Sequence, residues 1–87
     1  MTGVQYHQLT EFLQAFIRGT DRSKAHAAAI EGFLIEHLYE DEAFEDLIEG
    51  LARYQPGGGA FLYDEHALLP LVAAAMEEVK KRSSANG

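Results

Sequence analysis

The chain has no cysteine among its 87 residues. This absence excludes disulfide scaffolds, zinc–thiolate sites and thiol nucleophiles, and it fits a reducing compartment. No apolar run approaches the roughly 18 residues that a membrane-spanning helix needs. Residues 1–6 have neither the basic region nor the apolar region of a secretory leader. We therefore expect a cytoplasmic protein that does not enter a membrane.

Basic residues are scarce. Seven Lys and Arg stand against fourteen Asp and Glu, which gives a formal net charge of −7. Because binding to nucleic acid or anionic lipid depends on clustered Lys and Arg, we expect no direct contact with either. Hydrophobic residues make up 47% of the chain, which is typical of a folded protein and too apolar for a disordered one. The length leaves room for a single domain, residues 1–87.

Four segments have the hydrophobic period of an amphipathic helix. Their apolar stripes are Leu9, Phe12, Leu13, Phe16 and Ile17; Ile30, Phe33, Leu34 and Leu38; Phe44, Leu47, Ile48 and Leu51; and Leu68, Leu71, Val72, Ala75, Met76 and Val79. No period-2 strand pattern competes with them. The sequence therefore predicts an all-α protein, a small four-helix bundle with an antiparallel or slightly irregular arrangement.

Cap and breaker residues separate the first three helices. Gly19 is a natural stop for the first helix. Three residues after it carry oxygens that can cap the second helix: Thr20, Asp21 and Ser23. Asp41 can cap a third helix that runs to about Tyr54. The boundary between the second and third helices stays open, because residues 40–42 are equally compatible with one long bent helix.

The last third begins with a loop. Proline followed by three glycines predicts a flexible connection at about residues 55–60. Residues 60–63 fit either an extended segment or the entry to the last helix. Asp64 can cap that helix, in which Pro70 is acceptable only in the first turn or at the effective start. Residues 83–87 should fray.

Negative charge is concentrated in the middle of the chain. Residues 25–52 contain no Lys or Arg. Their acids are Glu31, Glu36, Glu40, Asp41, Glu42, Glu45, Asp46 and Glu49. Like charges four residues apart on a helix cost a few tenths of a kcal/mol each, and folding does not require that cost. A surface for a basic partner would explain it; the alternative is a solvated acidic face whose first acids favour the start of the third helix.

Aromatic residues lie in or just beyond this acidic segment: Tyr39, Tyr54, Phe61 and Tyr63. Tyrosine is a common interface anchor, since it combines a large rigid face with a hydroxyl group. Tyr54 and Tyr63 flank the glycine loop, so they either present from one end of the bundle beside the acids or form a partly buried rim of the core. The predicted partner-binding residues are the eight acids with Tyr39, Tyr54 and Tyr63.

Catalytic and metal-binding motifs are missing. The four histidines are His7, His26, His37 and His66. No Glu-x-x-His pair of a di-iron bundle and no EF-hand loop occurs around them. The glycine run lacks the Lys-Ser/Thr of a phosphate-binding loop. We therefore predict a protein that is not an enzyme and holds neither a metal nor another cofactor.

Residues of the last third follow a known pattern. They are Pro56 and Gly58, Leu62-Tyr63 in place of a Leu-Ile-Tyr-Tyr segment, an apolar helix through Val72 and Val79-Lys80, and Arg82 followed by Ala85-Asn86-Gly87. In these residues the chain resembles the DNase-colicin immunity proteins, small acidic helical inhibitors of about this length. The resemblance implies that a basic toxin domain is gripped by acids of the second helix and a loop tyrosine, here Glu31, Glu36, Glu40 and Tyr63.

The leading prediction is an acidic protein-binding module, of the inhibitor or immunity type, that masks a basic partner such as a nuclease. The first alternative is a structural or regulatory subunit that forms a homodimer. The runs Ala27–Ala29 and Ala73–Ala75 would let the second and last helices approach closely or would supply a dimer seam, although alanine is also simply a good helix former. The second alternative is an enzyme or metal protein built around His37.

Overall fold

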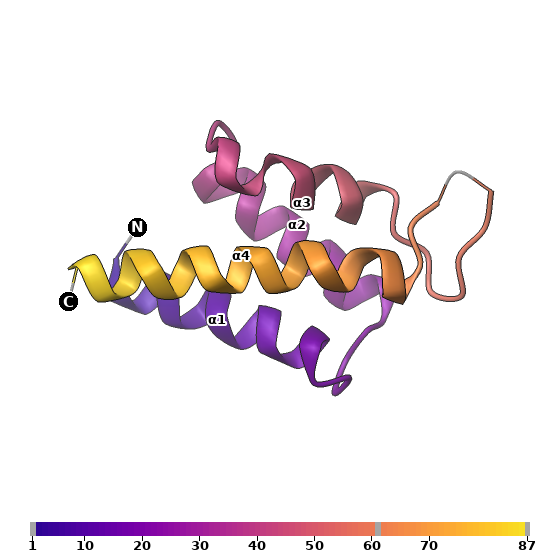
Figure 1. The fold of residues 1–87 in the computed structure, drawn as a ribbon, viewed down its shortest axis with the longest axis horizontal. Coiled ribbons are helices and arrows are strands. Elements are labelled where there is room, and N and C mark those ends of the chain that lie inside the picture. The colour runs from indigo at the N-terminus through magenta and orange to yellow at the C-terminus, as the bar shows by residue number, and fades with distance from the viewer. Residues whose placement is uncertain (1, 61, 87) are drawn as a thin grey trace.

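The structure, a computed structural model, describes residues 2–60 and 62–86, the last three of them by their backbone only. Four helices follow one another: α1 (Gly3–Ile17), α2 (Lys24–Leu38), α3 (Glu42–Ala52) and α4 (Glu65–Asn86). Successive helices run in opposite directions, and α4 returns to lie beside α1 (Figure 1). The predicted all-α, antiparallel four-helix bundle is confirmed.

The start of α1 has a cap that the sequence analysis did not identify. The Thr2 side chain accepts a hydrogen bond from the Gln5 backbone N–H, and the Gln5 side chain accepts one from the Thr2 N–H. This reciprocal pair satisfies two N–H groups that the helix leaves without partners. At the other end Gly19 has φ of 77°, a left-handed conformation that glycine adopts without steric cost, and it ends the first helix as predicted.

The boundary between α2 and α3 is a tight turn. Of the three candidate caps for α2, Ser23 is the one used, since its side chain accepts from the His26 N–H. The turn is closed by a 3.0 Å hydrogen bond from the Asp41 N–H to the Leu38 carbonyl. The Asp41 side chain then accepts from the Ala43 N–H and caps α3. The structure therefore has two separate helices, α2 and α3, and not the one long bent helix that the sequence also allowed.

The third helix ends at Ala52, two residues before the predicted end. Tyr54 instead forms an isolated parallel bridge with Tyr63. The Tyr63 N–H donates to the Arg53 carbonyl at 3.0 Å, and the Gln55 N–H donates to the Tyr63 carbonyl at 2.9 Å. The described residues 62 and 63 thus belong to an extended segment laid beside the end of α3, and not to the entry of the last helix.

The last helix contains Pro70 in its interior, and the expectation that it lies in the first turn is wrong. Asp64 caps the helix as predicted, since its side chain accepts from the Ala67 N–H at 2.8 Å. Pro70 is therefore the sixth helical residue, and the carbonyl of His66 lacks the N–H that would normally bond to it. Both residues are exposed, so water can satisfy that carbonyl while buried Leu68 and Val72 hold the helix on the core.

The last helix extends to Asn86, and Gly87 lies outside the described residues. That residues 83–87 fray stays a prediction. Residues 83–86 are Ser, Ser, Ala and Asn, and none of them is a proline or glycine that would stop a helix.

The core is built from all four predicted stripes. Its fully buried large side chains are Phe16, Phe44, Leu9, Leu13, Ile30, Leu34, Leu68, Val72 and Val79. Each helix packs on its two neighbours in the ring, so α2 contacts α1 and α3, and α4 contacts α1 and α3. None of the described helices is both long and apolar enough to cross a membrane.

The expectation that the alanine runs bring the second and last helices together is wrong. Helices α2 and α4 lie across the diagonal of the bundle and do not pack on each other. Ala27 and Ala75 are buried in the core, but the other four alanines of the two runs are exposed. Large side chains fill the centre between the diagonal helices, so the small residues there do not form a close helix–helix contact.

Candidate functional site

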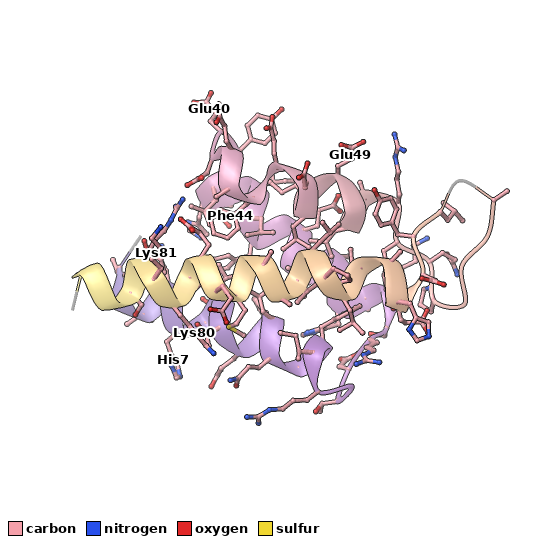
Figure 2. The ribbon with its side chains drawn as sticks, in the orientation of Figure 1. His7, Glu40, Phe44, Glu49, Lys80 and Lys81 are labelled. Atoms are coloured by element: carbon pink, nitrogen blue, oxygen red, sulfur yellow. The ribbon has the colours of Figure 1, made fainter. Side chains whose placement is uncertain are left out.

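The acids of α3 form a continuous exposed row. Phe44, Leu47 and Leu51 recur with the helical period and turn one face of α3 into the core. The remaining face carries the exposed acids Glu42, Glu45, Asp46 and Glu49. Figure 2 shows Phe44 pointing from α3 toward α4, whereas Glu49 points away from α4 at the outer edge of the molecule. The packing of the core thus determines which way these carboxylates face.

The acids of α2 do not form one surface. Glu31 and Glu36 are five residues apart, which places them about 140° apart around the helix axis. Glu31 is half-buried and Glu36 is exposed. Because α2 ends at Leu38, Glu36 and Glu40 are not a regular i, i+4 pair, as the sequence analysis assumed. Glu40 belongs to the turn and points outward there (Figure 2).

Asp41 has a basic partner that residues 25–52 could not reveal. Both of its carboxylate oxygens accept hydrogen bonds from the guanidinium of Arg82, 41 residues later in the chain. The Arg82 Nε donates to Glu78 at 2.9 Å, and the guanidinium lies over the Phe44 ring, 5.1 Å from its centroid. These bonds lower the pKa of Asp41. Asp41 thus has a structural role, and its predicted role as a partner contact stays a prediction.

The other acids have weaker interactions with basic residues, or none. Glu49 approaches Arg53 at 3.5 Å, but more than half of each side chain is exposed, so the pair is weak. Within the described part of the chain, six acids have no Lys or Arg within 4.0 Å: Glu31, Glu36, Glu40, Glu42, Glu45 and Asp46. Five of these six are exposed. The uncompensated charge therefore gathers on α3 and around the α2–α3 turn.

Tyr39 lies among these uncompensated acids. It follows the last residue of α2, and 65% of it is exposed. An open hollow of about 480 Å³ on one side is lined by Tyr39, Glu40, Glu42, Glu45, Ile48 and Glu49. A second, of about 550 Å³, is lined by Glu36, His37, Leu38, Tyr39, Glu40 and Asp41. Tyr39 and Glu40 line both hollows, so the turn places an aromatic ring among carboxylates.

Tyr54 belongs to the core, and the expectation that it contacts a partner is corrected. Only 2% of it is exposed, and its ring packs edge-on against Phe16, with 5.4 Å between the centroids. Its hydroxyl donates to the Arg22 carbonyl at 2.5 Å. Burial, and to a smaller extent the negative charge of Glu65, raises the pKa of Tyr54. Tyr63 is half-buried beside it, and Phe61 lies outside the described residues.

The structure does not assemble the surface that the immunity-protein resemblance implies. Tyr63 is hydrogen-bonded to Arg53 and Gln55, just after the end of α3, whereas Glu40 precedes the start of that helix. The 11 residues of α3 span about 16 Å. Glu31 and Glu36 are on different flanks of α2. Of the predicted site, the structure brings together Tyr39, Glu40 and the acids of α3.

Ile35 is an exposed apolar residue near Tyr39 that the sequence analysis missed. It is 44% exposed and lies one helical turn before Tyr39. The signal was present in the sequence, because Ile35 follows Leu34 and falls outside the apolar stripe of its helix. A large aliphatic side chain outside the stripe is forced to the surface when the stripe packs.

The two partly buried histidines have structural contacts. The His26 Nε2 is 2.8 Å from the Phe12 carbonyl, and its ring packs edge-on against Phe12. The His37 ring lies 4.5 Å from the Phe33 ring, and its Nδ1 is 3.5 Å from the Gln5 side-chain nitrogen. Among the described residues, no three His, Asp or Glu side chains converge as metal ligands would.

Comparison with protein families, with curated proteins and with solved structures gives no significant match to this chain. The resemblance to the DNase-colicin immunity proteins therefore stays a prediction. The fold and the surface together define a small acidic helical bundle, with an exposed tyrosine set among uncompensated carboxylates at the α2–α3 turn.

Proposed function

We propose that this protein is a non-enzymatic protein-binding module, of the inhibitor or immunity type, that masks a basic partner protein. The observation that carries the proposal is the position of Tyr39, which is 65% exposed and is bordered by two hollows lined with carboxylates. Tyrosine supplies contact area at low entropic cost, and the acids supply steering and specificity. We place the interaction in the cytoplasm, as the sequence predicts.

The arrangement of charge on α3 supports this proposal. Glu42 with Asp46 and Glu45 with Glu49 are like-charge pairs four residues apart on one helix, and each costs a few tenths of a kcal/mol. A partner that brings Lys or Arg to this row removes the repulsion. Glu42 and Glu45 lie in the first turn of α3, where negative charge is favourable, so a binding function accounts chiefly for the repulsion that Asp46 and Glu49 add.

A protein that handles nucleic acid is the class of partner that fits best. Such a protein presents clustered Lys and Arg toward phosphate groups. The acidic surface carries charge of the same sign as a phosphate backbone and can occupy such a cationic groove. Masking that groove would inhibit a nuclease without any chemistry on the part of this protein.

The proposal is tested with a pair of charge variants. Glu40→Gln/Glu45→Gln removes two acids that line the hollows, and Glu11→Gln/Glu77→Gln removes two exposed acids of α1 and α4. Tagged wild type and both variants are used to capture proteins from the native lysate at low salt and at about 0.5 M, where the Debye length falls to a few ångströms. Far-UV circular dichroism confirms that each variant is folded.

We expect the wild type and the α1/α4 variant to retain one basic protein at low salt and to release most of it at high salt. The hollow variant should bind it at least tenfold more weakly, and its residual binding should depend less on salt. An equal loss of binding in both variants would show that binding depends on net charge and not on the acids that line the hollows. Recovery of nothing but the protein itself, together with a dimer in sedimentation, would favour the homo-oligomer.

A further inference from the structure

The acids do not account for the apolar side chains beside them. Among the described residues, four large hydrophobic side chains are exposed: Val4, Ile35, Tyr39 and Leu62. Val4 and Leu62 lie apart, near the start of α1 and beside the glycine loop. Ile35 and Tyr39 are one turn from each other on the same flank of α2. An apolar row on a charged surface is a mark of an interaction site.

Tyr39 of this row lines the hollow on its α3 side, which we call the groove between α2 and α3, and Ile35 lies one turn before Tyr39 on α2. The hollow on the α3 side of Tyr39 has half-buried Ile48 among its lining residues, and Glu45 and Glu49 form its other border. Ile48 and Glu49 lie three and four residues after Glu45, so both are its neighbours on one flank of α3. The groove therefore has the Tyr39 ring at the end of α2, with Ile35 one turn before it, and the half-buried Ile48 and an acidic wall on α3.

The shape of the groove favours a helical occupant. It runs between two packed helices, where a third helix can place its side chains between theirs. Pairing with an extended peptide would need an exposed sheet edge, and the described residues contain only the isolated bridge between Tyr54 and Tyr63. An amphipathic helix presents apolar and charged side chains on adjacent faces, which matches the Tyr39 ring and the acidic wall of the groove.

The charge of the groove indicates a different protein and not a second copy of this one. Another copy would bring its own acidic surface near this one. Its exposed basic residues near the end of α4, Lys80 and Lys81, leave that helix on different sides (Figure 2). The large apolar residues of α4 nearest to them, Met76 and Val79, are buried, so neither lysine has an exposed apolar anchor beside it. The complementary partner is a basic amphipathic helix of another chain.

We infer that the groove between α2 and α3 binds a basic amphipathic helix of the partner protein. A large apolar side chain of that helix covers Ile35 and Tyr39, and its Lys or Arg side chains meet Glu45 and Glu49. This inference rests on the proposed function and specifies its partner. It adds to the proposed function that the apolar row contributes as much to affinity as the charge does.

The first experiment separates the apolar row from the acids. Ile35→Ser/Tyr39→Ser removes the row without changing charge, and Val4→Ser/Leu62→Ser removes the other two exposed hydrophobic residues as a control. With the captured basic protein as the probe, we expect at least a tenfold loss of affinity for the first variant, because its serines no longer bury large apolar surface against the partner. The control should bind within about twofold of the wild type.

The second experiment identifies what occupies the groove. A photo-crosslinking amino acid, p-benzoylphenylalanine, replaces Tyr39 in one protein and Glu77 on α4 in a control. After irradiation in the native lysate, mass spectrometry gives the sequence of the crosslinked peptide. We expect position 39 to yield a peptide of another protein with Lys or Arg and with apolar residues three and four apart. Position 77 should not yield that peptide.

The outcomes distinguish this inference from the proposed function. Suppose that Glu40→Gln/Glu45→Gln loses binding but Ile35→Ser/Tyr39→Ser does not. The proposed function is then supported, and the inference that a helix binds in the groove is wrong. A crosslink from position 39 to a second copy, or to a peptide without basic residues and helical spacing, overturns the groove as well. If neither variant changes binding, or no partner is captured, both proposals fail.

Discussion

Arg82, near the end of α4, donates hydrogen bonds to both carboxylate oxygens of Asp41, the residue that caps α3. Each side chain is less than a third exposed. The same carboxylate also accepts from the Ala43 N–H. One pair of residues therefore fixes the start of α3, closes the α2–α3 turn and ties the last helix to both. The pair lies next to the proposed binding surface, because Asp41 follows Glu40.

Replacing Arg82 by Gln should lower the free energy of unfolding by about 1–3 kcal/mol, because hydrogen bonds to a partly buried charge are lost and Asp41 keeps an uncompensated charge. Urea denaturation at pH 7 measures the change. Arg53→Gln is the control, since its pair with Glu49 is largely exposed and should contribute less than about 0.5 kcal/mol. Equal effects of the two substitutions would contradict the structural role of Arg82.

The pH dependence of the free energy of unfolding should show the contribution of the Asp41–Arg82 pair. Hydrogen bonds from Arg82 lower the pKa of folded Asp41 below the value of about 3.9 in an unfolded chain. The resulting stabilisation is complete above that unfolded value and is lost as the pH falls through the folded pKa. Asp41→Asn keeps a capping side chain but cannot titrate. We expect the wild type to lose stability more steeply than Asp41→Asn below about pH 4.

Urea denaturation from pH 7 to pH 2.5 tests this expectation. The pKa values of Asp21 and Glu65 are also lowered, by hydrogen bonds from Ser23 and from the Gly57 N–H. Both groups titrate in the wild type and in Asp41→Asn, so their effect cancels in the difference. A difference that stays constant over the whole range would show that Asp41 gains no stability from its charge.

Tyr54→Phe should lower stability by about 1 kcal/mol, because the Arg22 carbonyl loses its donor while the ring still fills the space beside Phe16. Tyr39→Phe is the matched control and should change stability by less than about 0.5 kcal/mol, as expected for an exposed position. Thermal and urea unfolding provide the measurement. If Tyr54→Phe weakened partner binding without lowering stability, Tyr54 would be a contact residue and not a core residue.

Two helical glycines should respond to alanine in opposite directions. Gly32 on α2 is exposed, and a Cβ there would meet nothing within 4 Å, so Gly32→Ala should stabilise the protein by about 0.5–1 kcal/mol through helix propensity. A Cβ on Gly50 would lie 2.9 Å from a Leu71 methyl and 3.0 Å from a Leu68 methyl.

Gly50→Ala should therefore lose the propensity gain and destabilise the protein by about 1 kcal/mol, because the Leu68 and Leu71 side chains must move in a packed core. The two variants are compared by urea denaturation under the same conditions. Stabilisation of similar size in both would show that the contact between α3 and α4 accommodates a methyl group without cost.

Local pattern was sufficient for much of the fold. The apolar stripes identified the four helices because burial follows the 3.6-residue period along each segment. The caps Ser23, Asp41 and Asp64 were predictable because a side-chain oxygen bonds to backbone N–H groups only two or three residues away. Pro70 was misplaced, because the burial of its neighbours outweighs one missing hydrogen bond.

The candidate site was only partly predictable. The exposure of the α3 acids followed from the stripe opposite them, and the position of Tyr39 among acids followed from the chain order around the turn. The positions of Tyr54 and Tyr63 did not, since loop residues have no periodicity that tells an exposed ring from a buried one. Ile35 was overlooked although its place outside the stripe marked it.

The sequence by itself determined the helices, their apolar faces and the concentration of charge in residues 25–52, because each depends on residues within a turn or two of one another. Only the tertiary structure decided that Arg82 neutralises Asp41, that Tyr54 is buried, and that Tyr39 lines one hollow with Ile48 and acids of α3. These relationships join residues that are far apart in the chain or on different helices, and they exist only once the helices have packed.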